Sequence, residues 1–242
     1  MSTTDFLDAP SNSHAREELF NHRLLYDLKL AAFGRGYHLQ TYYSDVDHDG
    51  FDVIFDDGDN LRKIQLKTVG GDAATNSWDI HRCILRPLAR NYEELGFDFV
   101  GNWGVEGGVV LIDHVIDKSD SLQVSYFYTD IYIINGIALG LIPRHGNTKN
   151  AANNLRDGLQ SGGSREKISV AKGLFVKVAS PQHLLCILGM HSTLKYSGWQ
   201  RRIRSLSSEE WGPKGRLLEN VLGEYRKEMP FVMKDITGFT DF

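Results

Sequence analysis

The chain has few cysteines and no long apolar run, and both shortages limit what kind of protein it can be. Its two cysteines, Cys83 and Cys186, lie far apart and form no CxxC unit. A disulfide framework or a structural zinc site is therefore not expected, and a reducing compartment suits the chain. No apolar run approaches the roughly 18 residues that span a membrane, and the polar residues 1–12 do not resemble a signal peptide. We therefore expect a cytoplasmic protein with no membrane partner.

Several catalytic signatures are missing as well. The chain has no Gly-x-Ser-x-Gly sequence, no Walker loop and no His-x-x-x-His pattern. The local motifs of the serine hydrolases, the P-loop enzymes and the common zinc enzymes are therefore not present.

The net charge of the chain is small, but its acidic and basic residues are unevenly distributed along the sequence. The net charge is −4 over 242 residues. Residues 1–60 hold 12 acidic and 4 basic residues, a net of −8, whereas residues 143–227 hold 15 basic and 6 acidic residues, a net of +9. Such asymmetry is the informative part of a charge count. An acidic segment suits a metal and a basic segment suits phosphates, although two solvated faces of opposite sign would give the same count.

The hydrophobic pattern predicts an α/β fold with a mixed central sheet flanked by helices. A helix is expected from Ser13 to about residue 33, followed by strands over 37–43, 51–55 and 62–68. A strand over 78–85 and a short helix over 88–95 come next, and the clearest strand signals cover 108–116 and 122–134. Further helices are expected over 150–159, 182–190 and 214–228, with a strand over 174–178. We expect one domain over 1–242, with a core of about 13–135 and a basic C-terminal elaboration of about 143–242.

The residues that suggest chemistry lie on the hairpin formed by the second and third strands. Side chains alternate between the two faces of a strand, so Gln65 and Lys67 share one face. If the loop consists of the four residues 57–60, Asp52 lies directly across from Gln65 and on the same face. A loop of odd length would break this relation unless a bulge compensates.

These three side chains suit metal-assisted hydrolysis of a phosphodiester. A hard divalent cation prefers oxygen ligands, offsets the charge of the phosphate and acidifies a bound water. Asp52 would anchor the cation, Gln65 would add its neutral side-chain oxygen, and Lys67 would orient the water or stabilise the charged transition state.

With a helical Glu, then Gly-Phe-Asp on a strand, then Gln-Leu-Lys, the chain resembles the PD-(D/E)xK, restriction-endonuclease-like nucleases, in the variant that has Gln in the second acidic position. The resemblance covers roughly residues 13–116, in the family order of helix, three strands, helix and strand. It implies cleavage of DNA that depends on Mg²⁺ or Mn²⁺, in restriction or another anti-phage defence. It also matches the helical Glu to Glu17 or Glu18, of which Glu18 is preferred. The chain departs from the family in having Phe51 before Asp52 in place of Pro, and in an apparent extra strand within 70–85.

Other interpretations of the same residues stay open. Asp45-Val-Asp-His-Asp-Gly50 matches the start of an EF-hand calcium loop, but its flanks predict strands where an EF-hand has helices. Arg201, Arg202 and Arg204 could contact phosphates or form a solvated basic stretch. A repair or junction-resolving nuclease, or an inactive nucleic-acid-binding module on the same fold, would carry a similar sequence. A homodimer is a possible assembly that the sequence does not decide.

Overall fold

A mixed sheet forms the centre of the chain, as expected from its apolar runs. The computed structural model describes residues 3–43, 50–70, 73–98, 104–117, 119–144, 146–161, 166–190, 198–214 and 218–239. The strands are β1 (Gln40–Tyr43), β2 (Val53–Asp56), β3 (Leu61–Gly70), β4 (Ser77–His81), β5 (Gly108–Ile116), β6 (Leu122–Asp130), β7 (Lys167–Ala171) and β8 (Val176–Val178).

Six strands pair in the order β1-β2-β3-β5-β6-β8, and β4 and β7 form a separate two-stranded sheet. β3 and β5 run parallel, whereas the other neighbours in the large sheet run antiparallel. The chain between these two parallel strands forms β4 and short helical segments, and it supplies the long crossover that a parallel pair requires. The expected α/β fold with a mixed central sheet flanked by helices is therefore confirmed.

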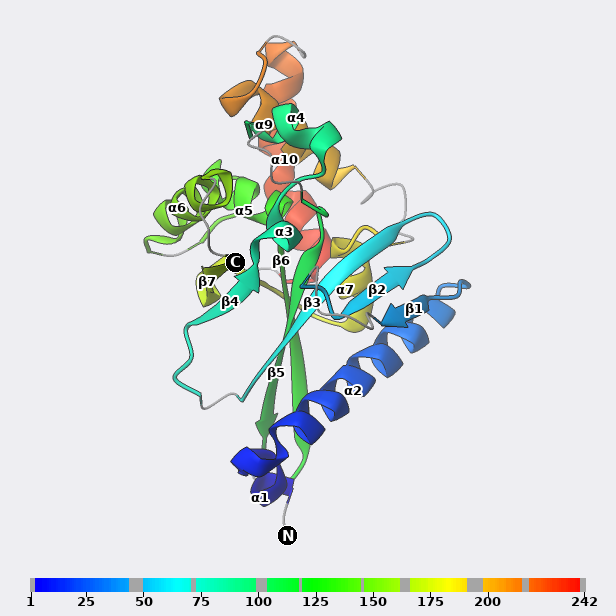
Figure 1. Cartoon of the computed structure of the whole chain (residues 1–242). Helices are drawn as coiled ribbons and strands as arrows, with labels where there is room; N and C mark the ends of the chain where they lie inside the picture. Colours follow the sequence, from blue (N-terminus) through cyan, green and yellow to red (C-terminus); the bar gives the residue numbers. More distant parts are fainter. Residues whose placement is uncertain are drawn as a thin grey trace.

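The helices lie on both sides of this sheet (Figure 1). The α-helices are α1 (Thr3–Asp8), α2 (Ser13–Phe33), α3 (Arg82–Leu85), α4 (Tyr92–Leu95), α5 (Ile131–Ala138), α6 (Thr148–Gln160), α7 (Pro181–Ile187), α9 (Trp199–Trp211) and α10 (Glu219–Thr237). Short 3₁₀ turns cover Pro10–Asn12, Ala89–Asn91 and Lys172–Leu174. No described helix is both long enough and apolar enough to span a membrane.

Helix α2 covers the sheet face that carries the even-numbered residues of β3 and β5. Its buried residues recur at helical spacing, and the ring of Phe20 stacks on His114 of β5 at 4.3 Å between centroids. His114 pairs with Gly70 of β3, so the two residues share a face. Arg62 of β3 donates to the backbone oxygen of Leu188, just after α7, at 2.9 Å. We infer that α2 and α7 share this side of the sheet, as Figure 1 shows.

The small sheet and α6 cover the opposite face, which carries the odd-numbered residues (Figure 1). Trp78 and Ile80 of β4 are buried, and Trp78 meets the ring of Phe175 edge-on. Lys172, which follows β7, forms an ion pair of 3.8 Å with Asp113 of β5. The sheet is therefore buried on both faces, as expected for a sheet with a parallel pair at its centre.

Three expectations about local structure need correction, and the first is that the helix expected over 214–228 covers Glu219–Thr237 instead. Residues 122–134 were expected to form a strand throughout, but the strand ends at Asp130, whose carboxylate caps α5 by accepting a hydrogen bond from the backbone of Ile133. The strand expected over 78–85 also ends early, because helix α3 begins at Arg82. In both places an apolar run is equally compatible with a strand or a buried helix. Helix α9 and strand β7 were not expected from the sequence at all.

Buried apolar residues from the whole described chain form one continuous cluster, from Leu7 to Ile236. Residues of the C-terminal part, such as Trp199 and Met233, belong to it together with Val53 and Ile64 of the hairpin. The C-terminal helices therefore contribute to the same core that supports the hairpin.

Candidate functional site

A tight hairpin sets the register between β2 and β3. The carboxylate of Asp56 accepts a hydrogen bond of 2.9 Å from the backbone of Gly58, which has a positive φ of 88°. Such an Asx turn is typical of an Asp-Gly loop. Val53 pairs with Ile64, and the strands are joined by the four residues 57–60, which is the loop length that the parity argument required.

Asp52 lies just before β2, where the regular pairing ends. Its backbone nitrogen donates a hydrogen bond of 2.9 Å to the backbone oxygen of Ile64, although Ile64 is already paired with Val53. The ring of Phe51 lies 4.6 Å from the ammonium of Lys63. Both features indicate a bulge-like irregularity, at which the alternation of side chains is interrupted. Strand parity therefore does not decide the direction of the Asp52 side chain.

The carboxylate of Asp52 instead approaches the backbone of β3. Its Oδ2 accepts a hydrogen bond from the backbone nitrogen of Leu66 at 2.5 Å. Leu66 is the residue between Gln65 and Lys67, so the structure brings an exposed carboxylate to the middle of the Gln-Leu-Lys segment.

Gln65 and Lys67 share the face of the sheet opposite α2. The pairing of β3 with β5 is regular from Ile64 to Gly70, so alternation holds at both residues. Gln65 is 7% exposed, and its side-chain oxygen accepts a hydrogen bond of 3.2 Å from the backbone of His81. Lys67 is half-buried, and its ammonium forms no hydrogen bond or ion pair with other described residues.

His81 lies beside the candidate site, and the sequence did not predict this position for it. Gly50 packs so closely on it that a Cβ on Gly50 would lie 2.2 Å from that of His81. One ring nitrogen of His81 lies 2.8 Å from the sulfur of Cys83. A His at the end of a strand and two residues before a Cys was visible in the sequence, but only the packing of β4 on the sheet places it next to Gln65.

Asp113 on β5 is a second residue that the sequence did not indicate. It pairs with Val69, so it faces the same side as Lys67, two residue pairs further along the strand. Its carboxylate is the ion-pair partner of Lys172. An acid within the apolar run Leu-Ile-Asp-His-Val-Ile was a weak signal of this position.

Glu17 and Glu18 are not brought to Gln65 and Lys67. Both side chains are exposed on α2, and α2 packs against the opposite face of the sheet. The expected contribution of a helical Glu therefore has no support in the described contacts.

Two of the three arginines expected to contact phosphates are engaged within the protein. Arg202 forms an ion pair of 3.2 Å with Glu228, and Arg204 forms one of 3.4 Å with Glu94. Arg201 is exposed on α9. Arg201 is therefore the member of this group best placed to contact a partner.

The EF-hand interpretation of the acidic segment before Gly50 is not tested by the structure, since Asp45, Asp47 and Asp49 lie outside the described residues. Within the described ranges, no three His, Cys, Asp or Glu side chains gather closely enough to hold a metal ion.

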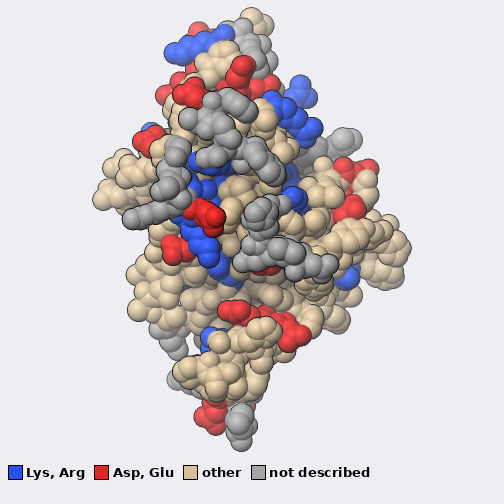
Figure 2. Space-filling view, viewed as in Figure 1, with Lys and Arg blue, Asp and Glu red and all other residues tan. Residues whose placement is uncertain are grey.

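Figure 2 shows Lys and Arg side chains along the middle of the visible face, in the region where Figure 1 shows α3 and β3.

Comparison with known proteins gives no relative. No protein-family model matches the chain, no curated protein matches it, and no solved structure matches it.

Proposed function

We propose that the protein is a metal-dependent DNA endonuclease that hydrolyses phosphodiester bonds around Asp52, Gln65 and Lys67. The observation that carries this proposal is the bond from the backbone of Leu66 to the carboxylate of Asp52. It joins an exposed acid to the strand segment on which a buried amide and a half-buried ammonium share one face.

The donor set suits Mg²⁺ or Mn²⁺. Mg²⁺ commonly binds through one or two carboxylates, with water and substrate phosphate completing its coordination. An ionised carboxylate has about four acceptor positions, so the bond from Leu66 does not prevent Asp52 from binding a cation. Gln65 offers an amide oxygen that accepts one long hydrogen bond from His81. A cation bound here would supply positive charge at the scissile phosphate and acidify the attacking water.

The residues of the chain have distinct roles in this proposal. Asp52 and Gln65 hold the cation, and the hydrogen bond from Leu66 orients the carboxylate. The ammonium of Lys67 stabilises the negative charge that develops on the phosphate, and its half-buried position strengthens that interaction relative to bulk water. The Lys and Arg side chains near β3 and α3 attract the DNA backbone.

The family order of elements over residues 13–116 supports the proposal in part. Helix α2, strands β1, β2 and β3, and strand β5 follow one another, with short helices before β5. Strand β4 stands between β3 and these helices, and it is the extra strand by which the chain departs from the family order. We also propose a role in restriction or another anti-phage defence, and this part of the proposal depends on the resemblance alone.

Incubation of supercoiled plasmid with the protein tests this function. Nicked and linear products should form with Mg²⁺ or Mn²⁺ and should not form with EDTA. Lys67→Ala should lower the cleavage rate by about 10²–10³, because it removes a charge aimed at the transition state, and should leave DNA affinity largely unchanged.

Lys63→Ala provides the matched control, since Lys63 lies on the same strand and face but stacks on Phe51. With saturating DNA, this variant should cleave near the wild-type rate. Cleavage by Lys67→Ala at the wild-type rate with saturating DNA would refute the proposed mechanism. A wild-type protein that binds plasmid but does not cut it with either metal would instead identify a binding module.

A further inference from the structure

Strand β6 extends beyond the end of its outer neighbour, β8. β8 ends at Val178, which pairs with Tyr126 of β6. Helix α7 begins soon afterwards, at Pro181, so the chain does not continue the strand. β6 itself already begins at Leu122. Among the described strands, only β5 therefore pairs with residues 122–125 of β6, and we call this stretch the open edge.

The backbone of Val124 points toward the outer side of the open edge. The backbone nitrogen of Asp117 donates to the oxygen of Ser121 at 3.0 Å in the turn between β5 and β6. Since hydrogen-bonded and non-hydrogen-bonded pairs alternate in an antiparallel ladder, Ser125 bonds to β5 and Val124 points away from it. The same alternation turns Leu122 outward. No described residue bonds to the outward N–H and C=O groups of these two residues.

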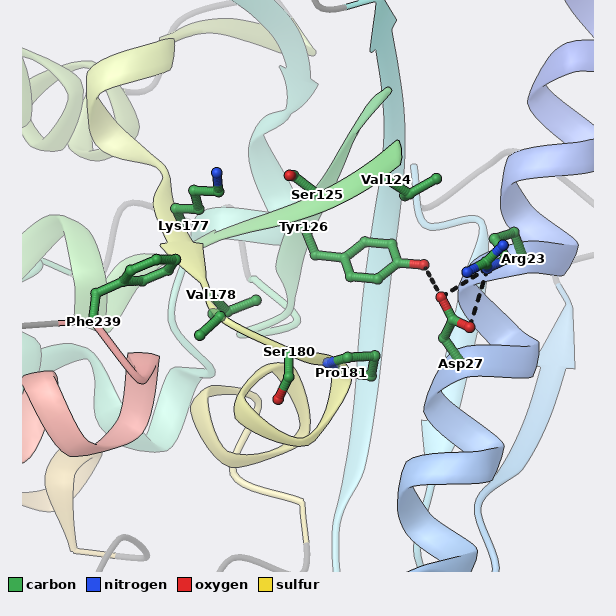
Figure 3. Close-up of a pocket in the computed structure, with 11 residues that line it drawn as sticks. Arg23, Asp27, Val124, Ser125, Tyr126, Lys177, Val178, Ser180, Pro181 and Phe239 are labelled. Carbon is green, nitrogen blue, oxygen red and sulfur yellow. Dashed lines mark hydrogen bonds and ion pairs between the residues drawn. The ribbon is translucent and has the colours of Figure 1, made fainter. Parts of the chain in front are cut away.

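A pocket of about 420 Å³ lies at the open edge (Figure 3). Tyr126 lines it from the face that α2 covers, where its hydroxyl donates to Asp27 at 2.7 Å. Ser125 and Lys177 also line it, and the strand register places both on the opposite face. Side chains of both faces can line one cavity only where it reaches around the edge of a sheet. The pocket is therefore a groove along the open edge.

The α2 side of this groove offers hydrogen-bond donors to an acidic side chain. Nε of Arg23 donates to both carboxylate oxygens of Asp27 at 3.0 and 3.1 Å (Figure 3). The terminal nitrogens of Arg23 carry further N–H groups that these bonds do not use, and the side chain is 49% exposed. The half-buried Val124 lines the same pocket. A carboxylate on a strand added beside Val124 can therefore accept from Arg23.

We propose that the open edge binds an extended segment of a partner protein, which adds a strand to β6 in line with β8. The backbone of the segment bonds to Leu122 and Val124, and an acidic side chain that points toward α2 meets Arg23. In strand addition, main-chain hydrogen bonds give the affinity and alternate side chains give the specificity.

A second copy of the chain suits this edge less well than a single segment does. The open edge covers only residues 122–125, whereas a stable interface between folded proteins buries about 800 Å² on each partner. One extended segment needs no more than the edge and its groove.

Hydrogen exchange measured by NMR tests the open edge. In the free protein, the amide of Val124 should exchange at least tenfold faster than that of Ser125, because only Ser125 is bonded to β5. The probe is the peptide acetyl-Lys-Thr-Val-Glu-Val-Thr-Lys-amide, which should slow exchange at Val124 at least tenfold and leave Ser125 unchanged. The same peptide with methylated backbone nitrogens should have no effect, and a peptide with Gln in place of Glu should bind at least threefold more weakly.

Val124→Pro is the informative variant, because it removes the outward N–H and an edge strand tolerates proline on its open side. It should bind the peptide at least tenfold more weakly, and thermal melting should show that it remains folded. Val124→Thr keeps the N–H and is the matched control, which should bind as the wild type does. If the proline variant does not fold, the methylated peptide decides the question.

Three results would overturn the proposal. The first is slow exchange of Val124 in the free protein, and the second is no protection by the peptide. The third is equal protection by the methylated peptide. Protection of Val124 that rises with protein concentration without peptide, together with a dimer in sedimentation, would assign the edge to a second copy instead. None of these outcomes depends on plasmid cleavage.

Discussion

Asp130 should give the protein an unusual pH dependence of stability. This carboxyl is 1% exposed and accepts hydrogen bonds from the backbone of Ile133 at 2.8 Å and from the hydroxyl of Tyr128 at 2.9 Å. Burial raises its pKa from 3.8 to about 6, although these hydrogen bonds and the charge of Arg62 act in the opposite direction. The substitution Asp130→Asn keeps an oxygen for Ile133 and removes the ionisation.

Whether stability rises or falls with pH depends on which state, folded or unfolded, binds the proton of Asp130 more tightly. The folded state keeps the proton of Asp130 up to about pH 6, whereas the unfolded state loses it near pH 4. The stabilisation is therefore complete below pH 4 and is lost as the pH rises through 6. Since one pKa unit corresponds to 1.36 kcal/mol, a shift of about two units corresponds to about 3 kcal/mol.

Urea denaturation of the wild type and Asp130→Asn between pH 4 and 8 measures this effect. The free energy of unfolding of the wild type, relative to the variant, should fall by about 2.4 kcal/mol between pH 4 and 8, which is most of the total effect, because the unfolded state is already partly ionised at pH 4. Other titrating groups cancel in this comparison. Asp79→Asn, which removes an exposed carboxylate of β4, controls for the loss of a charge. Parallel pH profiles for the wild type and Asp130→Asn would show that burial does not raise the pKa of Asp130 and would refute the reasoning.

Three further predictions concern metal binding, the packing of Gly50 on His81 and the binding of DNA. Asp52→Ala should abolish the binding of Mg²⁺ or Mn²⁺ in calorimetry, and unchanged binding would move the cation to the acidic segment 45–49. Gly50→Ala should lower the free energy of unfolding by at least about 2 kcal/mol, because the residue has a φ of 69° and a Cβ would collide with His81; a variant as stable as the wild type would contradict this packing. Arg201→Glu should weaken DNA binding and reduce its salt dependence without changing the cleavage rate at saturating DNA, and an unchanged affinity would exclude Arg201 from the interface.

Part of the candidate site followed directly from the hairpin sequence. The loop Asp-Gly-Asp-Asn has strong local turn preferences, and its length sets which residues of β2 and β3 face each other. The shared face of Gln65 and Lys67 follows from the period of a strand alone. The position of Asp52 did not follow in the same way, because a bulge interrupts the alternation at that residue.

The sequence by itself determined the class of the fold, the extent of α2 and the register of the hairpin, since these depend on hydrophobic period and turn chemistry within a few residues. Only the tertiary structure decided which segments meet. It placed His81 beside Gln65, put α2 with Glu17 and Glu18 on the far face, and engaged Arg202 and Arg204 within the protein. It also ended β6 at Asp130, where the capping carboxylate and the surrounding core favour a helix. These outcomes depend on contacts between residues far apart in the chain, for which local preferences carry no information.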